Sequence, residues 1–218
     1  MSERGRPRSF DRDQALQKAM EVFWARGYAG ASVAELTQAM GIAAPSLYAA
    51  FGGKADLYRE AMDRYIAQSG GRVWAQLEQP TARASVEAVL REAARGMTAP
   101  GQPAGCMVSL SGAQPGDLGA ELCAEMAARR SEMLAIFRAR LDRGQADGEI
   151  AATTDLEALA RFYVAVHQGM SLQAREGATE AQLQKLVDAA MAGWGALTGS
   201  DLPPLAGEAA GHRAKRDA

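Results

Sequence analysis

Apolar residues recur at helical spacing along most of the chain, and capping or glycine residues divide the pattern into separate segments. The first segment begins at the capping residue Asp11 and ends at Gly27, and one of its faces holds Leu16, Ala19, Met20 and Phe23. That spacing is typical of an amphipathic α-helix. No strand-like alternation extends beyond a few residues, and we find no internal repeat. The chain is therefore predicted to be all-α, with about nine helices.

Two short helices separated by a tight turn are predicted next. Ser32 and Glu35 form a capping box that opens the first of them, and Gly41 ends it. Pro45, at a plausible first helical position, starts the second, which a pair of glycines closes. Helix, glycine turn and helix is the sequence form of a helix-turn-helix. The alternative is an ordinary αα-hairpin inside a helical bundle.

The remaining helices are mostly longer. Their predicted ranges are Ala55 to Glu78, Thr81 to Met97, a short helix from Cys106, and Asp117 to Ala146. Two further capping boxes are predicted to open the last two helices, Thr154 with Glu157 and Thr179 with Gln182. Residues 200–218 carry scattered charge without periodicity, which predicts a flexible tail.

The composition is that of a packed globular protein, with 48% hydrophobic and 23% charged residues. No targeting segment precedes the first helix, and no apolar stretch approaches the roughly 18 residues of a membrane helix. We therefore expect a cytoplasmic protein without membrane contact. Two cysteines are too few for a disulfide framework, and with only two histidines beside them no closed zinc site is expected, nor any other metal or cofactor. No catalytic motif is present, which leaves a helical-bundle enzyme as an alternative without visible chemistry.

Residues 32–58, with the sequence SVAELTQAMGIAAPSLYAAFGGKADLY, closely resemble the DNA-binding signature of the tetracycline-repressor-like (TetR/AcrR) family. The resemblance implies a homodimeric transcription repressor that binds double-stranded operator DNA and is released by a small molecule. Nothing in the residues separates a repressor from an activator. By the same resemblance, Ala44, Pro45, Ser46 and Tyr48 take the recognition positions, and Ser32 and Lys54 take the phosphate-clamp positions.

The residues themselves support such a reading face. Six apolar side chains can fix the third helix on a small core, namely Val33, Leu36, Met40, Ile42, Leu47 and Phe51. The opposite face is small and uncharged, so its backbone can approach a major groove, and the hydroxyls of Ser46 and Tyr48 can reach phosphates or base edges. Many relatives carry polar residues where this chain has Ala43-Ala44. More of the specificity is therefore expected from apolar contacts, water and DNA shape.

The net charge of −2 does not by itself indicate DNA binding, so local placement matters. Arg4, Arg6 and Arg8 form a dense basic cluster ahead of the first helix. An extended arm of this kind can lie in an A·T-rich minor groove, and a solvated tail is the alternative. The predicted units are an arm with the DNA-binding domain over residues 1–53, a ligand-binding and dimerisation domain over 54–199, and the tail over 200–218.

Two copies of the chain are expected because one helix-turn-helix reads few base pairs. The last two helices are predicted to form a four-helix bundle across the dimer axis, and packing within one subunit is the alternative. The predicted interface residues are Leu159, Tyr163, Met170, Leu183, Leu186, Val187, Ala190, Met191 and Trp194.

The middle helices are expected to enclose the effector site, as the resemblance implies. Soft apolar side chains and one imidazole are predicted to line it, although each of them could equally be plain core: Trp74, Met97, Met107, Met126, Phe137, Phe162 and His167. Cys106, at a predicted helix N-terminus, raises a second possibility. The protein could be a thiol-based redox or electrophile sensor, or a metal sensor, on the same fold, whereas a buried inert cysteine is the alternative.

Overall fold

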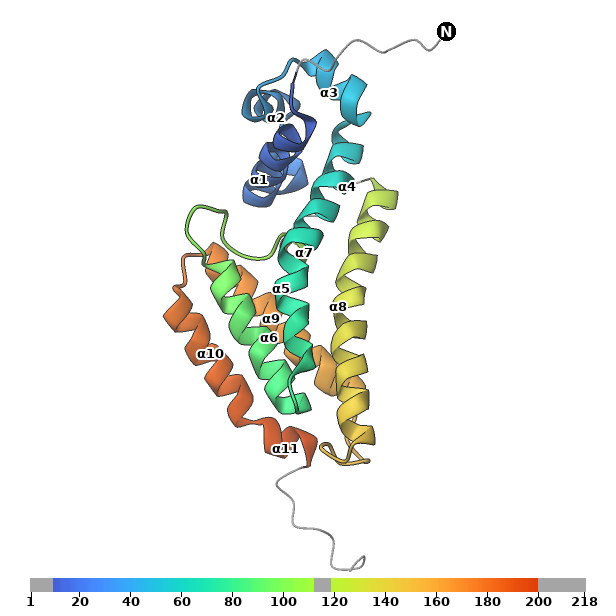
Figure 1. Cartoon of the computed structure of the whole chain (residues 1–218), viewed down its shortest axis with the longest axis vertical. Coiled ribbons are helices and arrows are strands. Elements are labelled where there is room, and N and C mark those ends of the chain that lie inside the picture. Colours follow the sequence, from blue (N-terminus) through green and yellow to red (C-terminus); the bar gives the residue numbers. More distant parts are fainter. Residues whose placement is uncertain (1–9, 112–118, 200–218) are drawn as a thin grey trace, which may run out of the picture.

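The computed structural model describes residues 10–111 and 119–199, and within these ranges it contains helices and no strands, as predicted (Figure 1). At one end of the molecule lie α1 (Arg12–Gly30), α2 (Val33–Met40) and α3 (Ala44–Phe51). From this three-helix unit, α4 (Lys54–Tyr65) leads into a bundle formed by the later helices. The predicted tail lies outside the described residues.

The first helix begins where the sequence predicts, because the Asp11 carboxylate accepts hydrogen bonds from the backbone N–H groups of Asp13 and Gln14. At Gly27 the backbone leaves the helical region, with φ 70° and ψ 177°, and only a short further turn follows. The predicted end of the helix is therefore confirmed as a break, which glycine adopts at low cost because it has no Cβ.

α2 and α3 meet across the predicted tight turn, in which Gly41 has a φ of 67°. The capping box of Ser32 and Glu35 is complete. α3 begins one residue earlier than predicted, so Ala44 is its first residue and Pro45 its second. Proline is tolerated there because the backbone N–H groups of the first turn have no partner within the helix.

The predicted helix from Ala55 to Glu78 is helical throughout, but the type of helix changes along it. After α4 come a π-helical turn, η1 (Ile66–Gly70), then α5 (Gly71–Trp74) and a 3₁₀ turn, η2 (Ala75–Glu78). The adjacent glycines Gly70 and Gly71 lower the helix propensity at this point. Since π-helical turns are often found at functional sites, the surroundings of η1 are of interest.

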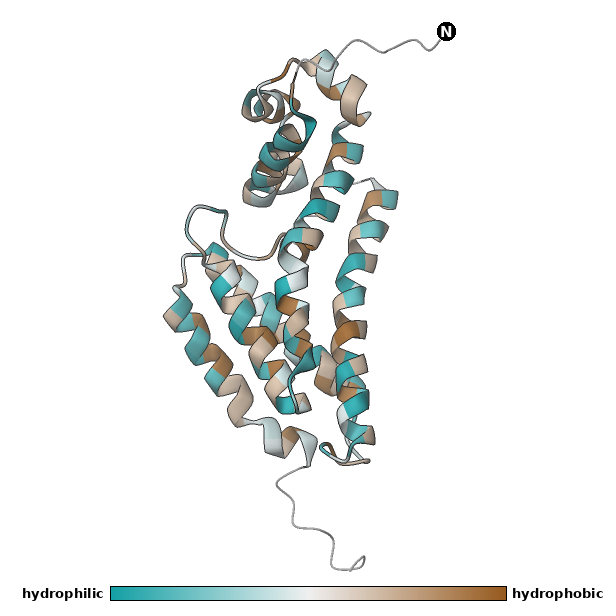
Figure 2. Cartoon of the chain, viewed as in Figure 1, coloured by the Kyte–Doolittle hydropathy of each residue, from teal (hydrophilic) through white to brown (hydrophobic). Residues whose placement is uncertain are grey.

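The bundle contains α6 (Ala82–Met97), the short α7 (Met107–Leu110), α8 (Ala120–Ala146), α9 (Leu156–Arg175), α10 (Glu180–Ala192) and α11 (Trp194–Thr198). α9 packs against α6, α8 and α10. The hydrophobic residues of α10 lie mainly on the side turned toward α6 (Figure 2). When residues 54–78 count as one bent helix and α10 with α11 as another, the described helices number nine, as predicted.

The capping box predicted for Thr154 and Glu157 is wrong. Asp155 caps α9, because its carboxylate accepts hydrogen bonds of 3.0 Å from the backbone N–H groups of Glu157 and Ala158. The Thr154 hydroxyl instead donates to the Thr198 carbonyl at 2.9 Å, which ties the start of α9 to the end of α11. Aspartate is as good a cap as threonine, and its charge also favours the helix N-terminus.

The predicted dimer interface also needs correction. Eight of the nine proposed residues are buried inside the single chain, where they pack between α9, α10 and their neighbours, so they have no surface left for a partner: Leu159, Tyr163, Met170, Leu183, Val187, Ala190, Met191 and Trp194. Leu186 is half-buried. The prediction selected the apolar stripe of each helix, and within one subunit that stripe faces the core.

The exposed side of α9 carries apolar groups of its own. Phe162 is 40% exposed and Leu172 is 50% exposed. Ala165 and Gly169 lie between them on the same face, at helical spacing. Beyond α10, Leu197 of α11 is 43% exposed. This surface, from Phe162 to Leu172, is called the α9 outer face below.

The three-helix unit is joined to the bundle through Trp24. Its indole N–H donates a buried hydrogen bond of 3.0 Å to the carbonyl of Gly105, which precedes α7. Its ring meets the ring of Tyr65 edge-on, with 4.8 Å between centroids. The Arg175 guanidinium of α9 donates to the carbonyls of Trp24 and Ala25, near the end of α1. One turn of α1 therefore contacts the bundle at several points.

A first prediction concerns the close packing of α8. An added Cβ on Gly144 would lie 2.6 Å from the Cβ of Ala82, which is too short for either atom to tolerate. We expect Gly144→Ala to lower the free energy of unfolding by about 1–3 kcal/mol, although alanine improves helix propensity by ~1 kcal/mol. Gly71→Ala, with nothing within 4 Å, is the matched control and should not destabilise the fold. Urea denaturation measures both, and equal effects would contradict this packing.

A second prediction concerns the Trp24 hydrogen bond. Trp24→Phe keeps an aromatic ring but leaves the buried Gly105 carbonyl without its donor, so we expect a loss of about 1–3 kcal/mol in the free energy of unfolding. Trp74→Phe is the matched control, because the Trp74 indole N–H has no hydrogen-bond partner among the described residues. Equal losses in the two variants, measured by urea denaturation, would mean that ring volume and not the hydrogen bond matters.

Candidate DNA-binding face and internal cavity

The third helix exposes the face that the sequence predicts. Leu47 is fully buried and Phe51 is 3% exposed, so these two side chains anchor α3 on the core of the three-helix unit. On the opposite side, Tyr48 is 53% exposed, and Pro45 and Ala49 are also exposed. Ser46 and Ala44 are half-buried beside them. The α3 face is therefore available to a partner, as the DNA-binding hypothesis requires.

The start of α3 is open as well as exposed. Ala43 occupies the N-cap and supplies no side-chain hydrogen bond to the first turn. Pro45 has no N–H and the Ser46 N–H donates to the Ala43 carbonyl at 2.9 Å, but the positive end of the helix dipole lies at this turn. Such an uncapped N-terminus can bind a phosphate group. The helix dipole therefore supplies some of the positive potential that the uncharged side chains of α3 do not provide.

The two predicted phosphate-clamp residues already have partners within the chain. The Ser32 hydroxyl accepts from the Glu35 backbone N–H at 3.2 Å, and lies 3.0 Å from the Glu35 carboxylate. The Ser32 backbone N–H also donates to this carboxylate at 3.0 Å, and this bond, followed by that of the hydroxyl, holds the pKa of Glu35 below its usual range; Arg26 pairs with the carboxylate at 2.7 Å. The Lys54 ammonium stands 4.3 Å from the centroid of the Tyr28 ring. This contact positions Lys54 at the start of α4.

The predicted minor-groove residues Arg4, Arg6 and Arg8 lie outside the described residues.

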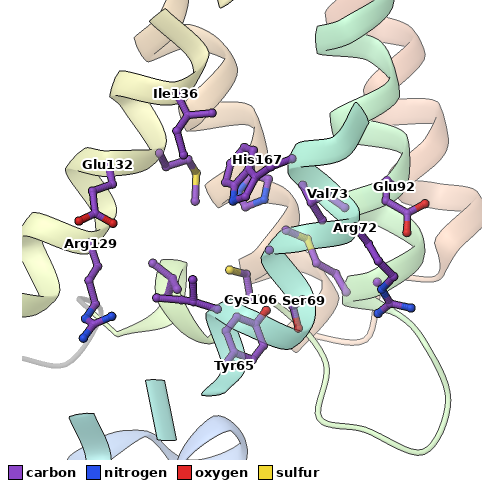
Figure 3. A pocket seen from close by; sticks show the side chains of 18 of the residues that line it. Tyr65, Ser69, Arg72, Val73, Glu92, Cys106, Arg129, Glu132, Ile136 and His167 are labelled. Carbon is purple, nitrogen blue, oxygen red and sulfur yellow. The ribbon is translucent and has the colours of Figure 1, made fainter. Parts of the chain in front are cut away.

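A cavity of about 240 Å³ lies within the bundle, between α4, η1, α5, α6, α8 and α9 (Figure 3). Its inner wall is apolar and buried, with Ala93, Met97 and Met133 among its residues. Exposed polar side chains mark its outer part: Arg72, Gln102 and Glu132. A largely apolar cavity with a few polar groups is typical of a small-molecule site.

The His167 imidazole and a cluster of polar groups around Tyr65 line this cavity. His167 of α9 points into it, is 4% exposed, and its Nδ1 atom has no hydrogen-bond partner among the described residues (Figure 3). Burial lowers the pKa of His167 to about 4, so the imidazole is neutral near pH 7. On another wall, the Tyr65 hydroxyl hydrogen-bonds to the side chains of Cys106 and Ser69. Burial, followed by the Cys106 thiol, raises the pKa of Tyr65 well above its usual range.

Three of the seven predicted ligand-binding residues line this cavity, namely Trp74, Met97 and His167. The others lie elsewhere. Met107, Met126 and Phe137 are buried in the core but are not part of the cavity wall, and Phe162 lies on the α9 outer face. Helical spacing identifies a buried stripe, but it does not indicate which part of the stripe borders empty space.

The sequence analysis missed the contribution of the N-terminal half. Trp24 of α1 and Tyr65 of α4 both line the cavity. A signal for Trp24 was present, because it lies four residues after Met20 and thus on the same side of the first helix. That side continues beyond the core of the three-helix unit and reaches the bundle.

Cys106 also lines the cavity but is 8% exposed. Its backbone N–H donates to the Ser171 hydroxyl at 2.7 Å, and it precedes only the four-residue α7. Within the described ranges, no three metal-ligating side chains gather in one place. The metal-sensor alternative therefore gains no support from Cys106, Cys123 and His167. The described helices also include none that is long and apolar enough to cross a membrane.

Comparisons with known proteins agree with this architecture. Residues 15–61 match the model of "bacterial regulatory proteins, tetR family", and residues 81–194 match a "tetracyclin repressor-like, C-terminal domain". The HTH-type transcriptional repressor ComR of Escherichia coli (strain K12) is 36% identical over 194 residues, which cover 88% of this chain and 92% of the relative. The repressor BdcR of the same organism is 37% identical over 194 residues, covering 87% of this chain and 90% of the relative.

A solved structure extends the similarity to the whole fold. It contains a cysteine mutant of the TetR family transcriptional regulator CifR, complexed with a 26bp double-strand operator DNA. CifR is 45% identical in sequence, with a TM-score of 0.82, and the match covers 86% of this chain and 98% of the CifR chain. Since both family models match and relatives above 30% identity align over most of their length, the chain belongs to the TetR family of transcriptional regulators.

Proposed function

We propose that this chain is a homodimeric repressor that binds operator DNA through the α3 face and leaves it when a small molecule occupies the bundle cavity. The observation that carries the proposal is the exposed, uncharged α3 face, held on the buried Leu47 and Phe51 and joined through α1 and α4 to the walls of a cavity. Such a protein acts on its operator by binding and not by catalysis, and it works in the cytoplasm, where the operator is.

On the DNA, Pro45, Ser46 and Tyr48 enter the major groove, and the open start of α3 meets a phosphate. The geometry allows this approach because the exposed residues between Ala43 and Ala49 are small apart from Tyr48. Lys54 neutralises a second phosphate from the start of α4. The CifR relative, whose solved structure includes operator DNA, supports operator binding by this chain. The basic arm of Arg4, Arg6 and Arg8 adds minor-groove contacts.

In the dimer, the α9 outer face of one copy packs against that of the other. Its exposed Phe162 and Leu172 supply apolar area, while Ala165 and Gly169 between them allow close approach of the two helices. An isologous twofold contact of this kind presents two α3 faces on one side. Each must reach one of two major grooves about 34–36 Å apart.

Release follows from the contacts that the cavity shares with the DNA-binding unit. Trp24 and Tyr65 belong to α1 and α4, and both line the cavity. A ligand that moves either side chain also moves a helix to which α3 is attached. The result is a population shift between a form whose α3 spacing matches DNA and one whose spacing does not.

A third prediction tests the α3 face. Tyr48→Ala should weaken operator binding in a fluorescence-anisotropy titration by roughly tenfold, since it removes both an apolar contact and a hydroxyl. Tyr48→Phe separates the two contributions, because it removes only the hydroxyl.

Lys54→Ala should reduce the salt dependence of operator binding, lowering the slope by about 1, because it removes one phosphate contact. Lys185→Ala on α10, exposed and outside the DNA-binding unit, is the charge-matched control. If the Tyr48 and Lys54 variants bind like wild type, the assigned face is wrong.

A fourth prediction tests the dimer. Phe162→Glu should shift the protein toward a monomer, because it would place two carboxylates against each other across the twofold contact. Sedimentation-velocity measurements at micromolar concentration detect the change. Leu197→Glu is the matched control, since Leu197 has similar exposure but lies on α11 outside the α9 outer face. A dimer that survives Phe162→Glu and Leu172→Glu together would rule out this surface.

A further inference from the structure

The inner end of the bundle cavity presents one unsatisfied polar atom in an apolar setting. His167 is 4% exposed, and its Nδ1 has no hydrogen-bond partner among the described residues. The side chain is directed into the cavity and not into the packed core (Figure 3). A buried imidazole with an unpartnered nitrogen is costly, so such a side chain in a cavity wall is a recognition point for a ligand atom.

The surroundings of His167 define the charge that a ligand can carry there. The imidazole is neutral near pH 7 because burial lowers its pKa to about 4. Of the charged groups that line the cavity, Arg129 pairs with Asp63 at 2.6 Å and Glu92 pairs with Arg95 at 2.8 Å, while the exposed Arg72 and Glu132 lie at its outer part. An ion bound at the inner end would have no free countercharge beside it, and burying it would be expensive.

The rest of the inner wall is apolar and adaptable. Met97 and Met133 line it with Val73, Ala93, Val108 and Ile136. Methionine side chains adjust to irregular apolar shapes. The volume of about 240 Å³ is that of roughly eight water molecules in the liquid, which limits the occupant to a small molecule.

We infer that the cavity takes a small, uncharged, mainly apolar molecule bearing one hydroxyl or carbonyl group, and that this group hydrogen-bonds to the imidazole of His167. The inference rests on the proposed function, because it names the class of effector that the cavity binds. Neutral imidazole accepts a hydrogen bond at one nitrogen and donates from the other, so both ligand groups are compatible with it. The apolar part of the ligand lies against Met97 and Trp24, and through Trp24 it reaches the DNA-binding unit.

Four probes of nearly equal size and different polarity test the inference on the full chain. They are benzyl alcohol, toluene, benzoate and benzylamine, titrated by isothermal calorimetry at pH 7.5. Benzyl alcohol should bind more tightly than toluene by roughly tenfold, since only the alcohol satisfies the imidazole. Benzoate and benzylamine should bind more weakly than benzyl alcohol, because their charge would be buried without a partner. A tighter charged probe, or equal binding of benzyl alcohol and toluene, would overturn the inference.

Variants then assign the preference to one atom. In His167→Phe, toluene should bind at least as well as benzyl alcohol, because the polar partner is gone. Tyr163→Phe is the matched control: Tyr163 lies one turn earlier on α9, and its buried hydroxyl also lacks a partner among the described residues, but it does not line the cavity. It should keep the wild-type preference. If His167→Phe keeps that preference, another group recognises the hydroxyl and the inference is wrong. The ranking of the probes on wild type decides the ligand class even if a variant fails to fold.

Operator binding of the same wild-type preparation separates this inference from the proposed function. Specific operator binding with no binding of any probe would overturn the ligand class and leave DNA recognition intact. Absence of specific operator binding would contradict the proposed function, whatever the probes do.

Discussion

The hydrogen bond from the Trp24 indole to the Gly105 carbonyl connects two parts of the molecule with different tasks. The bond fixes one end of α1 on the segment before α7, and Arg175 of α9 fixes the neighbouring carbonyls. Because a buried carbonyl needs its donor, α1 cannot move alone without loss of stability. A displacement of the bundle wall near Trp24 is therefore transmitted to the helix-turn-helix.

The connecting helix α4 is held differently along its length. Three ion pairs join it to α8: Arg59 with Glu125 at 2.8 Å and with Glu121 at 3.9 Å, and Arg129 with Asp63 at 2.6 Å. These pairs are partly exposed, so each contributes little to stability. Just beyond them, the helix changes to the π-helical turn η1, which borders the cavity. α4 packs against α1 and ends in this irregular turn at the cavity, and the Trp24 contact resists separation of the two units.

The order of the helices could be predicted from the sequence, because capping residues and glycines determine helix ends through nearby backbone groups. Asp11, Gly27 and Gly41 determine nearby backbone geometry, and the structure has them where expected. The sequence alone does not predict an interaction between two residues that are distant in the chain. Thr154 was assigned as a cap, but its hydroxyl bonds to Thr198, 44 residues away. The interface and cavity predictions failed in part for the same reason, since an apolar stripe does not reveal whether it meets the core, a cavity or another subunit.

The uncharged character of α3 has a consequence for regulation. The DNA contacts proposed for Pro45, Ala49 and the Tyr48 ring would depend on close approach, because dispersion attraction falls by a quarter to a half when a gap of about 0.5–1 Å opens. Contacts between phosphates and arginine or lysine fall off much more slowly with distance. A reading face rich in basic residues would thus stay attracted to DNA after a small displacement. In the proposed complex, the small apolar face would lose its specific contacts more readily, so a movement on the scale of one side chain in the cavity would weaken operator recognition.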